Sequence, residues 1–166
     1  MAKGNNYIMI GMPGAGKSTI GVLLAKALGY NFVDTDLVIQ QKEGRLLREI
    51  IATEGNERFK VIEEEVNAGL EVEQSVVAPG GSAIYSDVAM KHFQEIGTVV
   101  YLKLSYDTVK KRLGNLQKRG VVLEKGQTLE DLYNERVPLY EKYADVTVTL
   151  DNLSIGDSLQ KVIEKL

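Results

Sequence analysis

Apolar residues occur along the chain in two alternating patterns, short continuous runs and longer stretches with helical spacing. Strands covered on both faces are apolar throughout, so the runs are expected to be buried β-strands. They are residues 7–10, 31–33, 75–78, 98–104 and 146–150. The helical patterns are expected to begin near Ser18, Leu37, Leu46, Glu57, Asp87, Asp107, Thr128 and Ser154. This alternation predicts an α/β fold, with a parallel sheet between two helical layers.

The helix expected after the first strand has a clear apolar face. That face is expected to comprise Ile20, Leu23, Leu24, Ala27 and Leu28. Gly29 follows directly, and glycine commonly ends helices because it adopts the left-handed conformation without penalty. The pattern therefore predicts one helix over residues 18–28 that packs on the sheet.

Residues 11–18 read Gly-Met-Pro-Gly-Ala-Gly-Lys-Ser, a complete G-x-x-x-x-G-K-[ST] motif. Its glycines let backbone N–H groups turn toward the phosphates of a nucleoside triphosphate. Lys17 supplies positive charge to the β- and γ-phosphate oxygens, and the Ser18 hydroxyl can bind magnesium. The motif lies between an expected strand and an expected helix, as its mechanism requires. Nucleotide binding is therefore favoured over a chance glycine-rich turn.

Two acidic residues follow the second expected strand, in the sequence Asp34-Thr35-Asp36. Parallel strands end at one edge of a sheet, so both carboxylates are expected beside the phosphate loop. One could hold magnesium through water while the other orients an attacking hydroxyl or accepts its proton. The alternative is that Asp34 or Asp36 caps the helix that follows.

Composition limits the other classes of function. With 44% hydrophobic and 26% charged residues, the chain is expected to be one globular domain over residues 1–166. It has no long apolar run or signal-peptide pattern, so we expect no membrane association. The net charge of −3 offers no broad basic surface for nucleic acid. The lack of cysteine agrees with the cytoplasm, where ATP is available, and we expect a monomer there.

The stretch 114–127 is polar, lacks clear periodicity and is bracketed by Gly114 and Gly126. It is expected to be a mobile surface segment that could act as a lid. A plain solvated loop is the alternative. Arg119 is the only arginine in this stretch, and proximity to a triphosphate would make it a clamp on the reacting phosphates.

Beyond these patterns, the whole chain resembles the shikimate kinases, a family of small P-loop kinases. The resemblance is carried by GMPGAGKST at 11–19, DTD at 34–36, Gly44-Arg45, Glu54-Gly55 with Phe59, Glu63 and Glu64, Gly80-Gly81, and ERVPLY at 135–140. The first motif occurs in many unrelated proteins, but this ordered set does not. The resemblance implies a three-layer P-loop kinase fold with a five-stranded parallel sheet, a mobile lid near 114–127 and an acceptor-binding region near 35–66.

The resemblance also implies roles for individual residues. ATP would be bound by Gly11, Gly14, Ala15, Gly16, Lys17, Ser18, Thr19, Arg112 and Arg119, with Arg112 or Lys111 near the adenine. The acceptor would be bound by Asp36, Lys60, Gly80, Gly81, Ser82 and Arg136. Catalysis would rest on Lys17, Asp36 and Arg119, and magnesium would lie near Ser18 and Asp34.

Arg136 and a run of glutamates can also be interpreted from the residues themselves. A guanidinium suits bidentate recognition of a carboxylate or phosphate, although a surface salt bridge from Arg136 to Glu135 or Asp131 is the alternative. The run Glu63-Glu64-Glu65 is expected to face water, as most charge runs do.

Three departures from the family pattern fall on the acceptor side. Lys60 stands where the family has an arginine after the phenylalanine, so the planar fork of a guanidinium is lost. Gly80-Gly81-Ser82 replaces a three-glycine turn, and residues 119–122 read Arg-Gly-Val-Val where Arg-Pro-Leu-Leu is usual. None of the three lies in the phosphate loop, so the class of reaction is better defined than the acceptor.

The expected function is magnesium-dependent transfer of the ATP γ-phosphate to an alcohol. The resemblance makes shikimate the first acceptor to consider, and another small hydroxy acid or amino acid, such as gluconate or homoserine, is an alternative. A nucleoside monophosphate kinase could use Arg45, Arg48 and Arg58 to bind an acceptor phosphate, but Asp34 and Asp36 would repel that phosphate. A nucleotide-binding regulatory domain without catalysis is a third alternative.

Overall fold

A computed structural model describes residues 3–113, 123 and 125–166. They form one sheet whose strands are β1 (Asn6–Ile10), β2 (Asn31–Asp34), β3 (Ser75–Ala78), β4 (Gly97–Lys103) and β5 (Val146–Thr149). The strand order is β2-β3-β1-β4-β5, and every pairing is parallel. The five strands expected from the apolar runs are thereby confirmed, each to within one residue at its ends.

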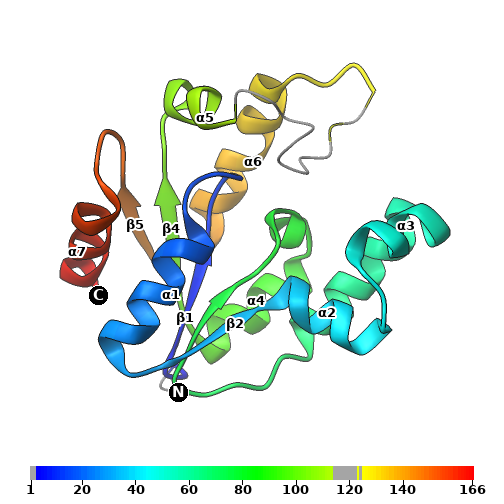
Figure 1. Ribbon diagram of the computed structural model, residues 1–166, viewed down its shortest axis with the longest axis horizontal. Helices are drawn as coiled ribbons and strands as arrows, with labels where there is room; N and C mark the ends of the chain where they lie inside the picture. The colour runs from blue at the N-terminus through cyan, green and yellow to red at the C-terminus, as the bar shows by residue number, and fades with distance from the viewer. Residues whose placement is uncertain (1–2, 114–122, 124) are drawn as a thin grey trace.

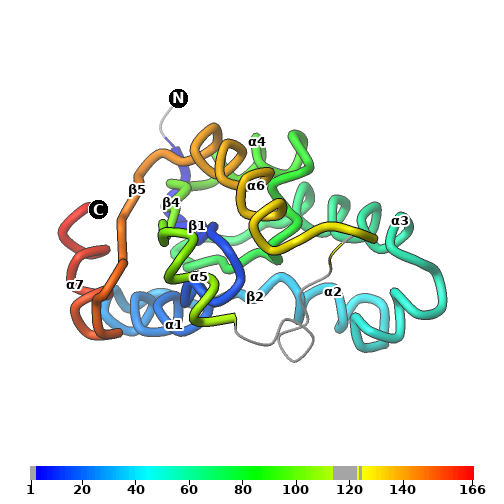
Figure 2. The backbone as a smooth tube through the Cα atoms, turned by 90° about the horizontal axis from the view of Figure 1, so that it is seen from above, coloured from blue at the N-terminus to red at the C-terminus, as the bar shows by residue number. Residues whose placement is uncertain are grey.

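Helices cover both faces of the sheet and give the molecule three layers (Figure 1). One face carries α1 (Lys17–Leu28) and α7 (Ile155–Lys165), and the other carries α4 (Asp87–Ile96) and α6 (Leu129–Tyr143). The remaining elements are α2 (Thr35–Glu43), α3 (Leu47–Ala68), the short 3-10 helix η1 (Gly81–Tyr85) and α5 (Tyr106–Arg112). Seen from above in Figure 2, α2 and the first part of α3 project to one side of the sheet.

The order of the strands creates a crevice at the carboxyl ends of β1 and β3. The chain leaves β1 through α1 on one face and leaves β3 through η1 and α4 on the other face. Neighbouring strands whose connections diverge in this way leave an opening where ligands commonly bind. The phosphate-loop motif and Gly80-Gly81 directly follow these two strands, so the fold brings them together.

Helix α1 packs on the sheet with a different face from the one expected. Its buried residues are Ile20, Gly21, Leu24 and Ala25, whereas Ala27 and Leu28 are exposed. The reason is a close approach at Gly21, where an added Cβ would lie 2.8 Å from the Phe32 ring. The missing side chain lets this side of the helix approach β2 and β3, and the last turn faces solvent.

Helix α3 is bent at Gly55, which has φ 84° and ψ 168°. The two helices expected to begin near Leu46 and Glu57 are the two parts of α3 on either side of this bend. Ile39 of α2 packs in a small apolar cluster with Ile50, before the bend, and Ile62, after it. This cluster gives α2 and α3 an apolar centre distinct from the main core.

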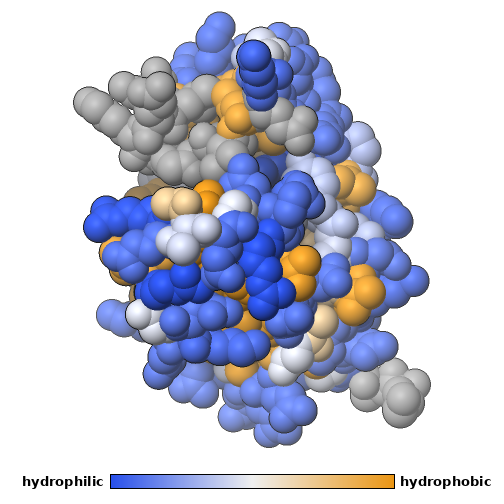
Figure 3. Space-filling view, turned by 90° about the vertical axis from the view of Figure 1, so that its right-hand side faces the viewer, coloured by the Kyte–Doolittle hydropathy of each residue, from blue (hydrophilic) through white to orange (hydrophobic). Residues whose placement is uncertain are grey.

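The face of the molecule on the side of α2 and α3 is mostly hydrophilic (Figure 3). Figure 3 views the side on which α2 and α3 lie, where hydrophilic residues predominate and apolar ones form small separate groups. Within residues 3–113, 123 and 125–166, no helix is long and apolar enough to cross a membrane. Most of the expected lid, including Arg119, lies outside the described residues.

Candidate active site

The phosphate loop is held open for an anion by its backbone. Gly14 and Gly16 have φ values of 81° and 93°, which favour glycine. Helix α1 begins at Lys17, and among the described residues no side chain caps its first N–H groups. The Lys17 ammonium donates hydrogen bonds to the carbonyl oxygens of Gly11 at 2.6 Å and Met12 at 3.2 Å. Free amides at a helix N-terminus and an adjacent ammonium form a phosphate-binding site.

A cavity of about 450 Å³ extends from this loop toward α3 and α6. It joins segments that are far apart in the sequence and carries charged groups of both signs. Its polar side chains are those of Lys17, Ser18, Asp34, Asp36, Glu63, Ser82 and Arg136. Apolar side chains of Leu47, Ile51 and Phe59 line another part of the wall. A cavity of this size with convergent polar groups is typical of a small-molecule site.

Asp34 and Asp36 both line the cavity, and one of them also has a structural task. The Asp34 carboxylate caps α2, because its Oδ1 accepts a hydrogen bond from the Asp36 backbone N–H at 2.9 Å. The capping alternative is therefore confirmed for Asp34. This bond uses one carboxylate oxygen and fixes the side chain beside the phosphate loop, so capping does not remove Asp34 from the cavity.

The charged groups in the cavity have altered acidity. Burial, followed by the nearby Asp34 carboxylate, raises the pKa of Asp36 from 3.8 to about 6, while Lys17 opposes the change. Burial and then the charge of Arg136 lower the pKa of Lys17 from 10.5 to about 8, while Asp36 opposes the change. Perturbed groups that share one cavity are typical of a catalytic site.

Arg136 is buried against the cavity rather than exposed. Arg136 is only 8% exposed, and its Nε donates a hydrogen bond to the Tyr85 hydroxyl at 3.3 Å. Within the described part of the chain, Arg136 forms no ion pair with Glu135 or Asp131, so the alternative interpretation as a surface salt bridge is wrong. Its Nη1 lies 2.7 Å from where a Cβ would stand at Gly81, so a side chain there would displace the guanidinium.

Glu63 is a cavity residue that the charge-run argument missed. Glu64 and Glu65 are exposed as expected, but Glu63 is 4% exposed and lines the cavity. Its Oε1 accepts a hydrogen bond from the Ser82 hydroxyl at 2.6 Å. The signal in the sequence was the spacing of four residues from Phe59, because residues i and i+4 lie on the same face of a helix.

Lys60 lies farther out than the resemblance implies. Its side chain is 51% exposed and its ammonium lies 3.8 Å from the Glu57 carboxylate. It lines a second cavity of about 340 Å³, which shares Ile51, Phe59, Ser82 and Arg136 with the first. The two cavities therefore adjoin, and Lys60 stands at the outer one.

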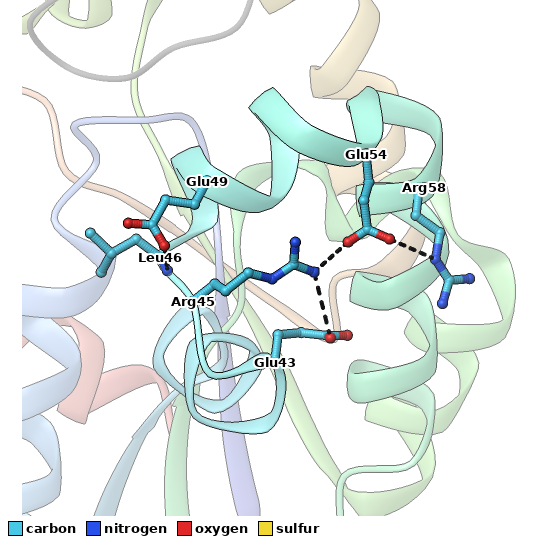
Figure 4. Close-up of polar contacts among 6 residues, drawn as sticks. All are labelled: Glu43, Arg45, Leu46, Glu49, Glu54 and Arg58. Carbon is cyan, nitrogen blue, oxygen red and sulfur yellow. Dashed lines mark hydrogen bonds and ion pairs between the residues drawn. The ribbon is translucent and has the colours of Figure 1, made fainter.

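Two of the arginines considered for an acceptor phosphate, Arg45 and Arg58, are engaged elsewhere. Arg45 pairs with Glu54 and Glu43, and Arg58 pairs with the other oxygen of Glu54 (Figure 4). Neither arginine lines either of the two cavities. These pairs join the turn after α2 to α3 on both sides of the Gly55 bend, which indicates a structural role.

The remaining expected ATP-site residues surround the phosphate loop. Arg112 donates a hydrogen bond from Nη1 to the Gly14 carbonyl at 3.0 Å, which places it at the loop, whereas Lys111 is exposed. Pro13, Gly14, Lys17 and Ser18 line the cavity, but Gly11, Ala15, Gly16 and Thr19 do not. Gly11 packs against β4, because a Cβ at this position would lie 2.7 Å from the Leu102 carbonyl oxygen.

Comparisons with known proteins agree with this geometry. A family model described as "Shikimate kinase" matches residues 13–166. The shikimate kinase of Mycobacterium avium is 38% identical over 162 residues, covering 96% of this chain and 92% of that protein. That of Histophilus somni is 37% identical over 168 residues, covering 99% and 96%.

Solved structures show the same relationship. A shikimate kinase from Acinetobacter baumannii in complex with shikimate has a TM-score of 0.86 and 31% identity, covering 97% of this chain and 92% of that one. A shikimate kinase from Aquifex aeolicus has a TM-score of 0.79 and 26% identity, covering 96% and 94%. The motif order, the parallel sheet and these matches together show that the chain belongs to the shikimate kinase family.

Proposed function

We propose that this protein transfers the γ-phosphoryl group of ATP to a hydroxyl group of shikimate, forming shikimate 3-phosphate. One observation carries the proposal: a single cavity joins the phosphate loop to Asp36 and the buried Arg136. This arrangement suits an acceptor with a hydroxyl at one end and a carboxylate at the other. The family is one of ATP-dependent kinases, and the related Acinetobacter baumannii structure is described as a complex with shikimate.

On the acceptor side, Asp36 and Arg136 would orient the substrate. The Asp36 carboxylate lies in the cavity with the phosphate loop, where it can accept a hydrogen bond from the attacking hydroxyl and then its proton. The Arg136 guanidinium suits a carboxylate, which it can bind with two parallel hydrogen bonds. Binding both ends of the acceptor would align its hydroxyl for attack on the γ-phosphorus.

On the ATP side, the loop amides and Lys17 would hold the phosphates and stabilise charge that develops on the transferred group. Arg112, at Gly14, lies where it can assist nucleotide binding. The resemblance gives Arg119 a further role on the phosphates. The need for ATP supports a cytoplasmic location for this reaction.

Ser18 and Asp34 are suited to hold magnesium. Both line the cavity at the phosphate loop, and Asp34 is fixed through only one oxygen by its capping bond. Magnesium is usually held by one or two protein oxygens together with phosphates and water, so this donor set is sufficient. When bound, the ion neutralises phosphate charge.

The test is an assay of ADP release with ATP, magnesium and a panel of acceptors. Shikimate is expected to give efficient turnover, with gluconate, homoserine and the nucleoside monophosphates near background. Asp36→Asn should lose turnover with shikimate while still binding ADP, because the phosphate loop is unchanged. Efficient turnover of another acceptor beside background activity with shikimate would contradict the proposal. Unchanged turnover in the Asp36→Asn variant would instead contradict the role of Asp36.

A further inference from the structure

Ser82 is the polar residue of the Gly80-Gly81-Ser82 turn, and its side chain has a defined partner. It lies in η1, directly after Gly80-Gly81, and its hydroxyl donates to Glu63 Oε1 of α3 at 2.6 Å. Both residues line the cavity that holds Asp36 and Arg136. The bond therefore lies in the wall of the candidate acceptor site.

The second oxygen of Glu63 and one oxygen of Asp36 both lie against Gly80. Glu63 Oε2 and Asp36 Oδ1 lie 2.8 and 3.0 Å from the position that a Cβ would occupy at Gly80. The absence of a side chain at Gly80 lets the two carboxylates share this part of the wall. Glu63 thus has one oxygen held by Ser82, and its other oxygen lies near Gly80 together with Asp36, the expected proton acceptor.

A neighbouring pair of the same kind ties the chain after η1 to α3 outside the site. The hydroxyl of Ser86, which follows η1, donates to Glu64 Oε2 of α3. Glu64 is exposed and lines neither of the two cavities. Both pairs tie α3 to this stretch of chain, Ser82 from within η1 and Ser86 from the start of α4, but only Ser82 and Glu63 do so inside the cavity.

We propose that Ser82 is a positioning residue, whose hydroxyl fixes the Glu63 carboxylate so that the acceptor site presents Glu63 beside Asp36 and across from Arg136. The inference rests on the proposed function and extends it to substrate specificity. Two fixed acceptor groups favour a substrate with several hydroxyl groups near the reacting one, and Arg136 favours a carboxylate at the other end.

The electrostatic surroundings of Glu63 support this assignment. Burial raises the pKa of Glu63, and the hydrogen bond from Ser82 opposes that change by favouring the ionised form. Asp36 of α2 also raises this pKa, while Arg136 of α6 and Lys60 of α3 lower it. Without the hydroxyl, Glu63 would be protonated at higher pH and would no longer act only as a hydrogen-bond acceptor.

A double-mutant cycle on shikimate phosphorylation tests the proposal. Ser82→Ala is expected to lower kcat/KM for shikimate about tenfold, mainly through KM, because it removes a hydrogen bond to a charged group. In the Glu63→Ala background the same change should have less than about a twofold effect, because the carboxylate that accepts the hydrogen bond is gone. Ser82→Thr keeps the hydroxyl and should restore most of the activity. KM for ATP should change little in all four proteins.

Two outcomes would overturn the proposal. An equal loss from Ser82→Ala in both backgrounds would mean that Ser82 acts on the acceptor directly, and no loss in either would mean that its hydroxyl has no role. Glu64→Ala is the matched control, since it removes the acceptor of the Ser86 hydrogen bond outside the cavities and should leave kcat/KM unchanged. Thermal unfolding of each variant identifies any that fails to fold.

A measurement independent of activity separates this proposal from the proposed function. NMR titration of the ¹³C-labelled glutamate carboxyls, with Glu63 assigned through Glu63→Gln, is expected to show a higher Glu63 pKa in Ser82→Ala than in Ser82→Thr or the unaltered protein. An unchanged pKa would contradict the Ser82 assignment. If the unaltered protein did not phosphorylate shikimate, the proposed function would fail while this titration still tested Ser82.

Discussion

The two sides of the cavity are built in different ways. The phosphate side is one continuous stretch of chain, with loop amides at the start of α1 and the Lys17 ammonium beside them. The proposed acceptor side takes Asp36 from α2, Glu63 from α3 and Arg136 from α6. Backbone groups are common to every sequence that adopts the loop, whereas side chains can change one at a time. The first side thus defines the class of reaction and the second defines the acceptor.

This difference predicts that changes on the phosphate side affect every acceptor alike. Lys17→Ala should lower kcat by about 1,000-fold, because it removes a charge that stabilises the transferred phosphoryl group. Shikimate affinity, measured by calorimetry in the absence of nucleotide, should change less than about threefold, because Arg136 and Asp36 remain in place. A loss of shikimate binding comparable with the loss of kcat would show that the two sides are not separable.

Changes at Arg136 should have the opposite selectivity. Arg136→Ala is expected to raise KM for shikimate about 100-fold, since it removes a buried cation that is suited to the acceptor carboxylate. Arg136→Lys should recover only part of this, because an ammonium lacks the planar fork. Steady-state kinetics with each substrate varied in turn provide the check. An equal rise in KM for ATP would contradict the assignment of Arg136 to the acceptor alone.

The acidity of Asp36 predicts a pH dependence that arises from the acceptor side. The pKa of Asp36 is raised to about 6, and only the ionised carboxylate can accept the proton of the attacking hydroxyl. Below that pH the ionised fraction falls, so kcat/KM for shikimate should fall about tenfold per pH unit. The pH profile of kcat/KM tests this in the free enzyme. A rate that stays level down to pH 4.5 would exclude Asp36 as the proton acceptor.

Lys60 provides the smallest expected effect. Its side chain is 51% exposed and already near Glu57, so Lys60→Ala should raise KM for shikimate only about threefold. Arg58→Ala is a matched control, because Arg58 has the same exposed fraction, pairs with Glu54 and lines neither cavity. A rise in KM for Lys60→Ala as large as for Arg136→Ala would show that Lys60 binds the acceptor directly.

The same difference explains how much of the molecule could be predicted from its sequence. The strands and the phosphate loop were predictable because each depends on residues that are adjacent in the chain. The buried faces of the helices were less predictable. Gly21 lets α1 approach Phe32 closely, and this contact between distant residues cannot be inferred from the spacing of apolar residues along the helix. Ala27 and Leu28 were misplaced for that reason.

The acceptor side depended on contacts between distant segments. Glu63 was grouped with its exposed neighbours, although its burial is set by packing against the turn at Gly80 and Ser82. The resemblance drew attention to Ser82 and Lys60 as expected departures from the family pattern. It could not show that Ser82 contacts Glu63 or that Lys60 stands at the outer cavity.

The most direct test is to identify the phosphorylated product by ³¹P NMR after incubation of the protein with ATP, magnesium and an equimolar mixture of shikimate, gluconate and homoserine. We expect one new phosphate monoester, shikimate 3-phosphate, and its loss in Asp36→Asn. A phosphorylated product from gluconate or homoserine, with shikimate unchanged, would contradict it and show that the acceptor side selects a different substrate.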